Sequence, residues 1–396
     1  MLIGFAALMR ILVVKLSSIG DVVHTLPAVA SIRRRHPQAR ISWVVDTRAS
    51  AILKDSPVID ELIEVDSSRL GRGLFDRQAM KEARLHLKQL RGRVGKDLNG
   101  GEVSAVEGGS GSPPDIAIDF QGLIKSGLIA FLSGANRRIG FASCELRERA
   151  SRYLLTDQVP TESAIHVIDK NLELAESIWP GAHGDRSCSD AGGSEGARRY
   201  EFPISVSEED TRYMSELLAN TGRAAIINPG GGWATKLWAA RRYGELADWL
   251  WNDCEIESFV TYGAGEEALA REVVSSSRSG MCQALPSTLK QFVALARRAK
   301  LFVGGDTGPL HLAAASGTPI VGLYGPTSPE RNGPFNTSDI TVGRNLWCRT
   351  GCYRRKCWHW ECMEIPIDEV KQAIRDRLAR PDEFAAAAGQ ITTFPV

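Results

Sequence analysis

The sequence lacks any apolar stretch of the roughly 20 residues that a membrane-spanning helix requires. Its opening segment, MLIGFAALMR, is apolar but short, and it has neither the charged start nor the small-residue cleavage site of a signal peptide. Met9 is an alternative start to Met1, because a segment typical of a strand follows it directly. Eight cysteines among 396 residues are too few for a disulfide-rich secreted scaffold. These absences predict a cytoplasmic protein.

A large excess of charge of either sign is also missing. The formal net charge is +1, which gives no indication of a nucleic-acid partner. Basic residues are unevenly placed, however: residues 66–96 hold nine lysines and arginines against three acids, and SIRRRHPQAR (residues 31–40) holds four arginines. Such clusters fit an anionic ligand or an anionic membrane surface, and they equally fit solvated helix faces.

The common phosphate-binding signatures are absent as well. The sequence contains neither a G-x-x-x-x-G-K-[ST] loop nor a G-x-G-x-x-G fingerprint. It contains no D-x-D pair either, so a carboxylate-bound metal that bridges to a diphosphate is not indicated. We predict neither a metal nor a cofactor for this chain.

Short apolar runs alternate with amphipathic stretches of helical length. Because these runs are continuous rather than alternating, they are typical of strands buried on both faces of a parallel sheet in an α/β fold. At 396 residues the chain is too long for one ordinary core, so two domains are expected. The runs are residues 11–14, 41–45, 116–118, 224–227, 258–262, 301–303 and 320–323.

The domain boundary is predicted near residue 204. Ser207 and Asp210 form a capping-box-like helix start, and a new strand begins at Ala224. We therefore predict domains at 1–203 and 204–396, each opening with a strand, a glycine-bearing loop and a helix, and facing each other across a cleft. Gly/Ser/Pro-rich stretches at 99–114 and 181–196 indicate surface loops, and the first belongs to a flexible insertion at about 91–114.

The stretch KLSSIGDVVHTLPA (residues 15–28) is placed where the first strand ends and a helix begins. Gly20 permits a tight turn close to a ligand. Asp21 has two interpretations that are compatible: an N-cap of the helix, which residue type and position favour, or a general base. Lys15 stands among aliphatic residues, so we expect it to point to an anion or a carboxylate at the strand end.

Three further loops carry candidate ligand contacts. In VGGDTGPLHLAAASG (residues 303–317) a strand leads through Asp306, Thr307 and Gly308 into a helix, whose free N–H groups suit a phosphate that His311 can also reach. The competing interpretation is that Asp306 or Thr307 caps the helix and His311 packs. Lys236 in INPGGGWATKLW is a second cation for a diphosphate, and the YGAGEE loop offers a carboxylate for ribose hydroxyls.

Four cysteines lie together near the C-terminus. Cys348, Cys352, Cys357 and Cys362 occur with His359 in CRTGCYRRKCWHWEC. Their spacings of three, four and four residues differ from the paired C-x-x-C of most zinc sites, so thiols without a metal are favoured over a structural metal.

Three stretches, taken in order, resemble the ADP-heptose:lipopolysaccharide heptosyltransferases. They are MRILVVKLSSIGDVVHTLPAVASIRRRHP, IDFQGLIKSGLIA and VGGDTGPLHLAAASGTPIVGLYGPTSP, and the resemblance extends from Met9 to about Leu378. The first stretch is most similar to the enzymes that add the first heptose to Kdo, whereas the cysteine-rich segment is more similar to those that add the second. The insertion before IDFQG looks longer than is usual in the family.

The resemblance implies two Rossmann-like domains of the GT-B type and an inverting, metal-independent transfer of heptose from ADP-heptose to Kdo-lipid A. It implies an N-terminal acceptor domain, a C-terminal ADP-sugar domain and a peripheral place on the cytoplasmic face of the inner membrane. Alternatives are transfer to a heptose acceptor, a UDP-sugar transferase or a UDP-N-acetylglucosamine 2-epimerase. A nucleotide-binding protein without activity is disfavoured by the intact motifs.

The resemblance also assigns roles to individual residues. Asp21 becomes the general base, and Lys236 stabilises the leaving diphosphate. Glu266, or equally Glu267, takes the ribose. The donor-binding residues it implies are Thr235, Lys236, Glu266, Asp306, Thr307, Gly308 and His311, and the acceptor-binding residues are Lys15, Ser18, Gly20, Gln121, Lys125 and Arg147.

Overall fold

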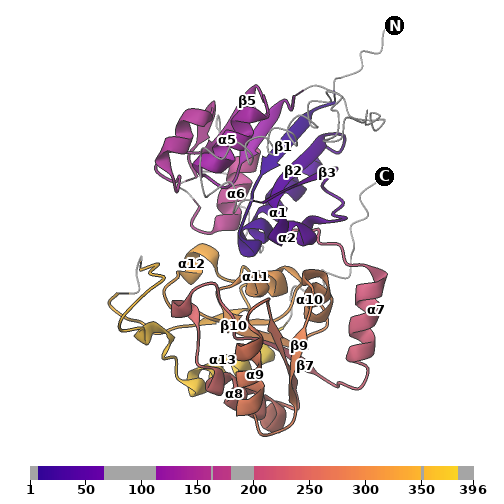
Figure 1. The fold of residues 1–396 in the computed structure, drawn as a ribbon, viewed down its shortest axis with the longest axis vertical. Coiled ribbons are helices and arrows are strands. Elements are labelled where there is room, and N and C mark those ends of the chain that lie inside the picture. Colours follow the sequence, from indigo (N-terminus) through magenta and orange to yellow (C-terminus); the bar gives the residue numbers. More distant parts are fainter. Residues whose placement is uncertain (1–7, 67–112, 162–163, 180–199, 349–351, 382–396) are drawn as a thin grey trace, which may run out of the picture. The chain divides into compact units, whose positions relative to one another are not determined.

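The computed structural model describes residues 8–66, 113–161, 164–179, 200–348 and 352–381. The chain divides into two compact units, residues 1–204 and 205–396, and this division falls one residue after the predicted boundary. Each unit contains a six-stranded sheet (Figure 1). Of the basic segment 66–96 and the insertion at about 91–114, only residues 66, 113 and 114 are described, and the stretch 181–196 lies outside the described residues.

The N-terminal unit has the strand order β3-β2-β1-β4-β5-β6, and all neighbouring strands are parallel. Its strands are β1 (Arg10–Val14), β2 (Arg40–Asp46), β3 (Glu61–Val65), β4 (Ile116–Asp119), β5 (Arg137–Phe141) and β6 (Asp157–Val159). Its described helices are α1 (Ile19–Arg35), α2 (Thr47–Leu53), α5 (Ile124–Leu132) and α6 (Val167–Glu176), with a 3-10 turn η1 at Arg149–Leu154. Because the strands are parallel, their carboxyl ends share one edge of the sheet, where ligands of such folds bind.

The C-terminal unit repeats this architecture with the strand order β12-β11-β10-β7-β8-β9, again all parallel. Its strands are β7 (Ala224–Asn228), β8 (Glu257–Tyr262), β9 (Cys282–Pro286), β10 (Leu301–Gly305), β11 (Ile320–Leu323) and β12 (Ile340–Val342). Its described helices are α7 (Glu208–Leu217), α8 (Ala240–Cys254), α9 (Glu267–Ser276), α10 (Leu289–Ala296), α11 (Gly308–Ala315), α12 (Pro329–Asn332) and α13 (Ile367–Ala379), with 3-10 turns η3 at Ala234–Lys236 and η4 at Glu361–Met363.

The central strands explain why the apolar runs are continuous. β7 and β10 are buried at every position, and β1 is buried from Ile11 onward, because helices cover both faces of a parallel sheet. All seven predicted runs lie in strands of the structure. The helix predicted after Ser207 is also confirmed: Ser207 is the N-cap of α7, and its hydroxyl oxygen accepts the backbone N–H of Asp210 at 3.0 Å.

No helix among the described residues is long and apolar enough to cross a membrane. This agrees with the absence of a long apolar run from the sequence.

A buried ion pair joins α13 to the sheet of the C-terminal unit. Arg377 Nε donates to Asp339 Oδ1 at 2.8 Å, and the two side chains are 1% and 2% exposed. Asp339 also accepts the backbone N–H of Ile320 at the start of β11. The pair therefore fixes α13 against the edge of the sheet.

Replacing Arg377 by methionine is expected to lower the free energy of unfolding by about 3–5 kcal/mol, because Asp339 would keep a buried charge without the guanidinium that balances it. Urea denaturation would measure the loss. The matched control is Arg375→Met on the same helix, where the exposed guanidinium lies 5.0 Å from the ring of Trp249 and its removal should cost about 1 kcal/mol or less. Equal losses for the two variants would show that the buried pair contributes no more than a surface contact.

Candidate active site

The loop between β1 and α1 places Asp21 at the carboxyl edge of the N-terminal sheet. Helix α1 begins at Ile19, earlier than the sequence indicated, so its N-cap is Ser18 and not Asp21. Asp21 is the third helical residue, and its Oδ2 accepts the backbone N–H of Ser18 at 2.7 Å and the Ser18 hydroxyl at 3.0 Å. One carboxylate oxygen thus stabilises the helix start, as in a capping box.

The other oxygen of Asp21 remains available. Among the described residues no hydrogen bond reaches Oδ1, and the nearest cation is Lys15 Nζ at 4.0 Å. Burial raises the pKa of this carboxyl, but the charge of Lys15, the hydrogen bonds from Ser18 and the charge of Arg147 lower it by more, so the pKa lies below that of an ordinary aspartate. The side chain is 34% exposed. The Asp21 carboxylate is therefore ionised and partly exposed, and the bonds at the helix start use its Oδ2 and not its Oδ1.

Lys15 is held between the loops that follow β1 and β4. Its side chain is 6% exposed, and its Nζ donates to the backbone oxygen of Phe120 at 2.8 Å. The prediction that Lys15 points to a carboxylate is confirmed by its distance to Asp21. Asp119, also within its field, is fully buried, and burial raises the pKa of that carboxyl to about 6 against the hydrogen bonds from Gln121, Ser126 and Gly122.

Gln121 connects the same two loops through its side chain. Its Oε1 accepts the backbone N–H groups of Leu16 at 3.1 Å and Ser17 at 3.2 Å, and the residue is 6% exposed. Gly122, the next residue, has a φ of +69°, a conformation that favours glycine at this turn. Gln121 thus fixes the loop that carries Asp21, and its oxygen is already bonded to protein. Lys125, the other candidate of this segment, is the second residue of α5 and is half-buried.

In the C-terminal unit a buried cluster forms where β10 leads into α11. Asp306 Oδ2 accepts from Lys236 Nζ at 2.6 Å, and the backbone oxygen of Asp306 accepts from the same ammonium at 2.9 Å. Its Oδ1 lies 3.1 Å from His311 Nε2 and accepts from Asn332 Nδ2 at 2.8 Å. Asp306 is 5% exposed. Burial raises its pKa, but His311 and Lys236 lower it by more, so the carboxyl is ionised well below its usual range.

Asp306 does not cap α11. The N-cap is Thr307, and α11 carries Pro309 in its first turn. His311 Nε2 lies within hydrogen-bond distance of Asp306 Oδ1, so it orients that carboxylate from within the helix. Thr307 Oγ1 is 3.5 Å from Asn228 Oδ1, so the loop after β10 contacts the carboxyl end of β7. Thr307 and Gly308 lie at the helix start where a phosphate was predicted.

Glu266 joins the loops after β7 and β8. Its Oε1 accepts the N–H of Gly231 at 3.2 Å, and its Oε2 accepts that of Gly263 at 2.8 Å. A Cβ at Gly230 would come within 2.4 Å of this carboxylate, so the close approach requires glycine there. Glu267 instead opens α9, and its carboxylate accepts the N–H of Gly265. Of the two ribose candidates, Glu266 is the one that contacts both glycine loops.

Two cations lie near the ring of Trp233, beside the buried ion pair of Lys236 and Asp306. Lys236 Nζ lies 4.6 Å from the centroid of the Trp233 ring, and the guanidinium of Arg355 lies 5.2 Å from it. Thr235 is 3% exposed, and its hydroxyl donates to the backbone oxygen of Arg354 at 2.8 Å. The segment after the second cysteine of the cluster therefore contacts the loop that carries Lys236.

Comparison with known proteins assigns the chain to a family. The sequence model of glycosyltransferase family 9 (heptosyltransferase) matches residues 113–359, more than half of the chain. The chain belongs to glycosyltransferase family 9. Its fold is similar to that of Escherichia coli heptosyltransferase WaaC with ADP, with a TM-score of 0.69 at 22% identity over 93% of this chain and all of that one.

Curated relatives of this glycosyltransferase have two different names. Lipopolysaccharide heptosyltransferase 1 of Pseudomonas aeruginosa is 27% identical over 360 residues, which cover 88% of this chain and 87% of the relative. Lipopolysaccharide heptosyltransferase 2 of Salmonella typhimurium is 27% identical over 347 residues, which cover 83% and 86%. The GT-B fold and the transferase class predicted from the sequence are confirmed.

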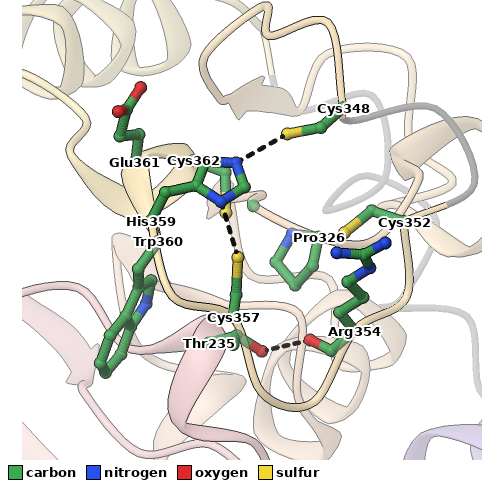
Figure 2. A pocket seen from close by; sticks show the side chains of 11 residues that line it. Thr235, Pro326, Cys348, Cys352, Arg354, Cys357, His359, Trp360, Glu361 and Cys362 are labelled. Atoms are coloured by element: carbon green, nitrogen blue, oxygen red, sulfur yellow. Dashed lines mark hydrogen bonds between the residues drawn. The ribbon is translucent and has the colours of Figure 1, made fainter.

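The four cysteines of this family 9 enzyme line one pocket (Figure 2). His359 lies between two of them: its Nε2 is 3.4 Å from Cys348 Sγ and its Nδ1 is 3.1 Å from Cys357 Sγ. All four cysteines are free thiols. Within the part of the chain that the structure describes, no three or more His, Cys, Asp and Glu side chains form a group that could hold a metal ion. Both imidazole nitrogens are instead occupied by thiols.

Sequence reasoning missed several residues of the enzyme's clusters. Asn332 bonds Asp306 from α12, and Asp119 anchors the turn of Gln121. Trp233 and Arg355 stood inside quoted motifs, but nothing in their spacing indicated that they meet. Asp119 was the one with a signal, since it is a carboxylate at the end of a predicted apolar strand.

Proposed function

We propose that this glycosyltransferase moves heptose from ADP-L-glycero-D-manno-heptose to Kdo of the lipopolysaccharide inner core, with inversion and without a metal ion. The N-terminal unit would hold the Kdo-lipid A acceptor and the C-terminal unit the ADP-sugar. The single observation that carries the proposal is the Asp21 carboxylate: one oxygen accepts from Ser18 at the start of α1, and the other receives no hydrogen bond from a described residue and lies 4.0 Å from Lys15 Nζ.

The proposed reaction is one displacement at the anomeric carbon. Asp21 Oδ1 takes the proton of a Kdo hydroxyl as that oxygen forms the new glycosidic bond. The bond from the anomeric carbon to the β-phosphate oxygen breaks, and ADP leaves with the electron pair. The charge that develops on this phosphate meets Lys236 and the N–H groups at the start of α11.

The cations near the proposed base fit an anionic sugar as the acceptor. Lys15 and Arg147 both act on the charge of Asp21, so two cations border the proposed base. Kdo carries a carboxylate and lipid A carries phosphates, so cations at this edge fit such an acceptor. The names of relatives point the same way: lipopolysaccharide heptosyltransferase 1 also occurs among relatives from Campylobacter coli and Escherichia coli, at 23% and 25% identity.

A heptose-bearing acceptor is the second candidate, because relatives named lipopolysaccharide heptosyltransferase 2 match at 26% and 27% identity. We further propose that the enzyme works peripherally at the cytoplasmic face of the inner membrane, where a lipid-linked acceptor would be presented. The partners would then be ADP-heptose, the lipid acceptor and the membrane surface.

ADP release from ADP-heptose separates these acceptors. We expect release that depends on Kdo-lipid A and that exceeds release with heptosyl-Kdo-lipid A by at least about tenfold, since an acceptor lacking its binding contacts loses that much. The reverse preference would replace the Kdo assignment by the second-heptose assignment. Tighter binding of UDP than of ADP would overturn the ADP-sugar donor altogether.

A further inference from the structure

The charge on Lys236 is already balanced within the protein. Its ammonium forms a 2.6 Å ion pair with Asp306, and the side chains are 14% and 5% exposed. Burial opposes the charge on Asp306, but His311 and Lys236 lower its pKa by more and keep it ionised, so the ion pair has little net charge to offer. A nucleoside diphosphate that leaves a sugar carries more than one negative charge, so electrostatic stabilisation requires further cations or N–H groups.

Arg355 lies where such a cation is required. Its guanidinium and the Lys236 ammonium share the ring of Trp233, at 5.2 Å and 4.6 Å from the centroid. The 3-10 turn η3 holds Lys236 close to Trp233, because the Lys236 N–H donates to the backbone oxygen of Trp233 at 3.0 Å. Arg355 is exposed and forms no salt bridge with another described residue, so its charge is not balanced as that of Lys236 is.

The segment that carries Arg355 is fixed to the same loop. The Thr235 hydroxyl donates to the backbone oxygen of Arg354, and the N–H of Tyr353 donates to the backbone oxygen of Pro326 at 3.1 Å. Thr235 and Pro326 also line the cysteine pocket (Figure 2). Two loops, one with Thr235 and one with Pro326, therefore hold the segment that places Arg355 beside Trp233.

We propose that Trp233, Lys236 and Arg355 form an anion subsite in which Arg355 binds the diphosphate of the sugar donor. This deepens the proposed function and rests on it. The cysteine-rich segment then belongs to the donor site. A guanidinium offers a planar pair of donors to a phosphate, whereas the ammonium of Lys236 acts as a compact charge already shared with Asp306.

Calorimetric titration of the full chain with ADP, AMP and adenosine tests the subsite without requiring turnover. Arg355→Ala is expected to weaken ADP binding by about tenfold or more, AMP binding by less, and adenosine binding not at all. Arg355→Lys should recover part of the ADP affinity, because it restores the charge without the planar donors. Added salt should narrow the difference between the wild type and Arg355→Ala.

Lys356→Ala is the matched control, since it removes one exposed positive charge from the next position. Equal weakening of ADP by the two alanine variants, or equal weakening of ADP and adenosine by Arg355→Ala, would overturn the subsite. Thermal melting of each variant excludes unfolding as the cause. If the wild type preferred UDP, the ADP-heptose donor would be wrong, and the same comparison with UDP and uridine would still decide the role of Arg355.

Discussion

Replacing Asp21 by asparagine is expected to lower acceptor-dependent ADP release by about 10²–10⁴-fold, which is the usual contribution of a positioned base. Asparagine keeps an oxygen that can accept the Ser18 N–H, so the start of α1 should survive. Because the donor binds the other unit in the proposed function, the affinity for ADP should not change. Steady-state kinetics and ADP titration of the same preparations measure both results.

The chain supplies a matched control in α7. Asp210 is the third residue of that helix, as Asp21 is of α1, and its Oδ2 accepts from the Ser207 hydroxyl at 2.7 Å. Asp210→Asn therefore removes a capping carboxylate of the same kind, at a cost of about 1 kcal/mol or less. If Asp21 only capped its helix, the two variants would behave alike, with similar small losses of stability and no selective loss of turnover.

The dependence of the rate on pH follows from the direction of the Asp21 pKa. Burial raises this pKa, but the charges of Lys15 and Arg147 and the bonds from Ser18 lower it by more, so the base stays ionised at lower pH than an ordinary aspartate does. A base is active when deprotonated, so Asp21 should cause no fall in kcat/KM as pH decreases through the ordinary carboxyl range. A fall in that range that disappeared in Asp21→Asn would contradict the lowered pKa.

The strands that sequence reasoning found and missed differ in their place in the sheets. All seven predicted runs belong to strands away from the ends of the two sheets. Of the five strands it missed, four are the edges, namely β3, β6, β9 and β12, and β5 lies next to an edge. Edge strands are only partly buried, so β3 (ELIEV) and β9 (CQALP) need no continuous apolar run.

The site residues show a similar limit. Motifs placed Asp21, Lys236 and Asp306 at strand ends, since a strand, a glycine turn and a helix start are local in sequence. The loops that carry them are fixed by residues far along the chain: Gln121 accepts from Leu16 across 105 residues, and Thr235 donates to Arg354 across 119. One sequence carries no signal for such pairs. The start of α1 was misplaced for a local reason, because Ser18 competes with Asp21 as a cap.

Replacing Lys236 by methionine is expected to lower kcat by about 10²–10³-fold, as the loss of one positioned donor to a developing negative charge does elsewhere. Methionine keeps most of the length of the side chain without the ammonium. Asp306 would retain its bonds to His311 and Asn332, so its carboxylate would not be left without partners and the unit should remain folded. Single-turnover measurement of ADP release, with the enzyme in excess over ADP-heptose and the acceptor saturating, isolates this step.

The ion pair with Asp306 determines whether Lys236→Met mainly weakens ADP binding or mainly lowers kcat. Because Asp306 balances much of the Lys236 charge before the donor binds, the affinity for ADP should fall less than kcat does. Lys300→Met is the control: Lys300 immediately precedes β10, whereas Asp306 immediately follows it, so the same substitution is made at the opposite end of one strand. If Lys236→Met weakened ADP binding fully as much as it slowed release, Lys236 would hold the donor equally before and during bond cleavage. A loss confined to kcat would instead place its action on the diphosphate as it leaves, with Arg355 left to hold the bound donor.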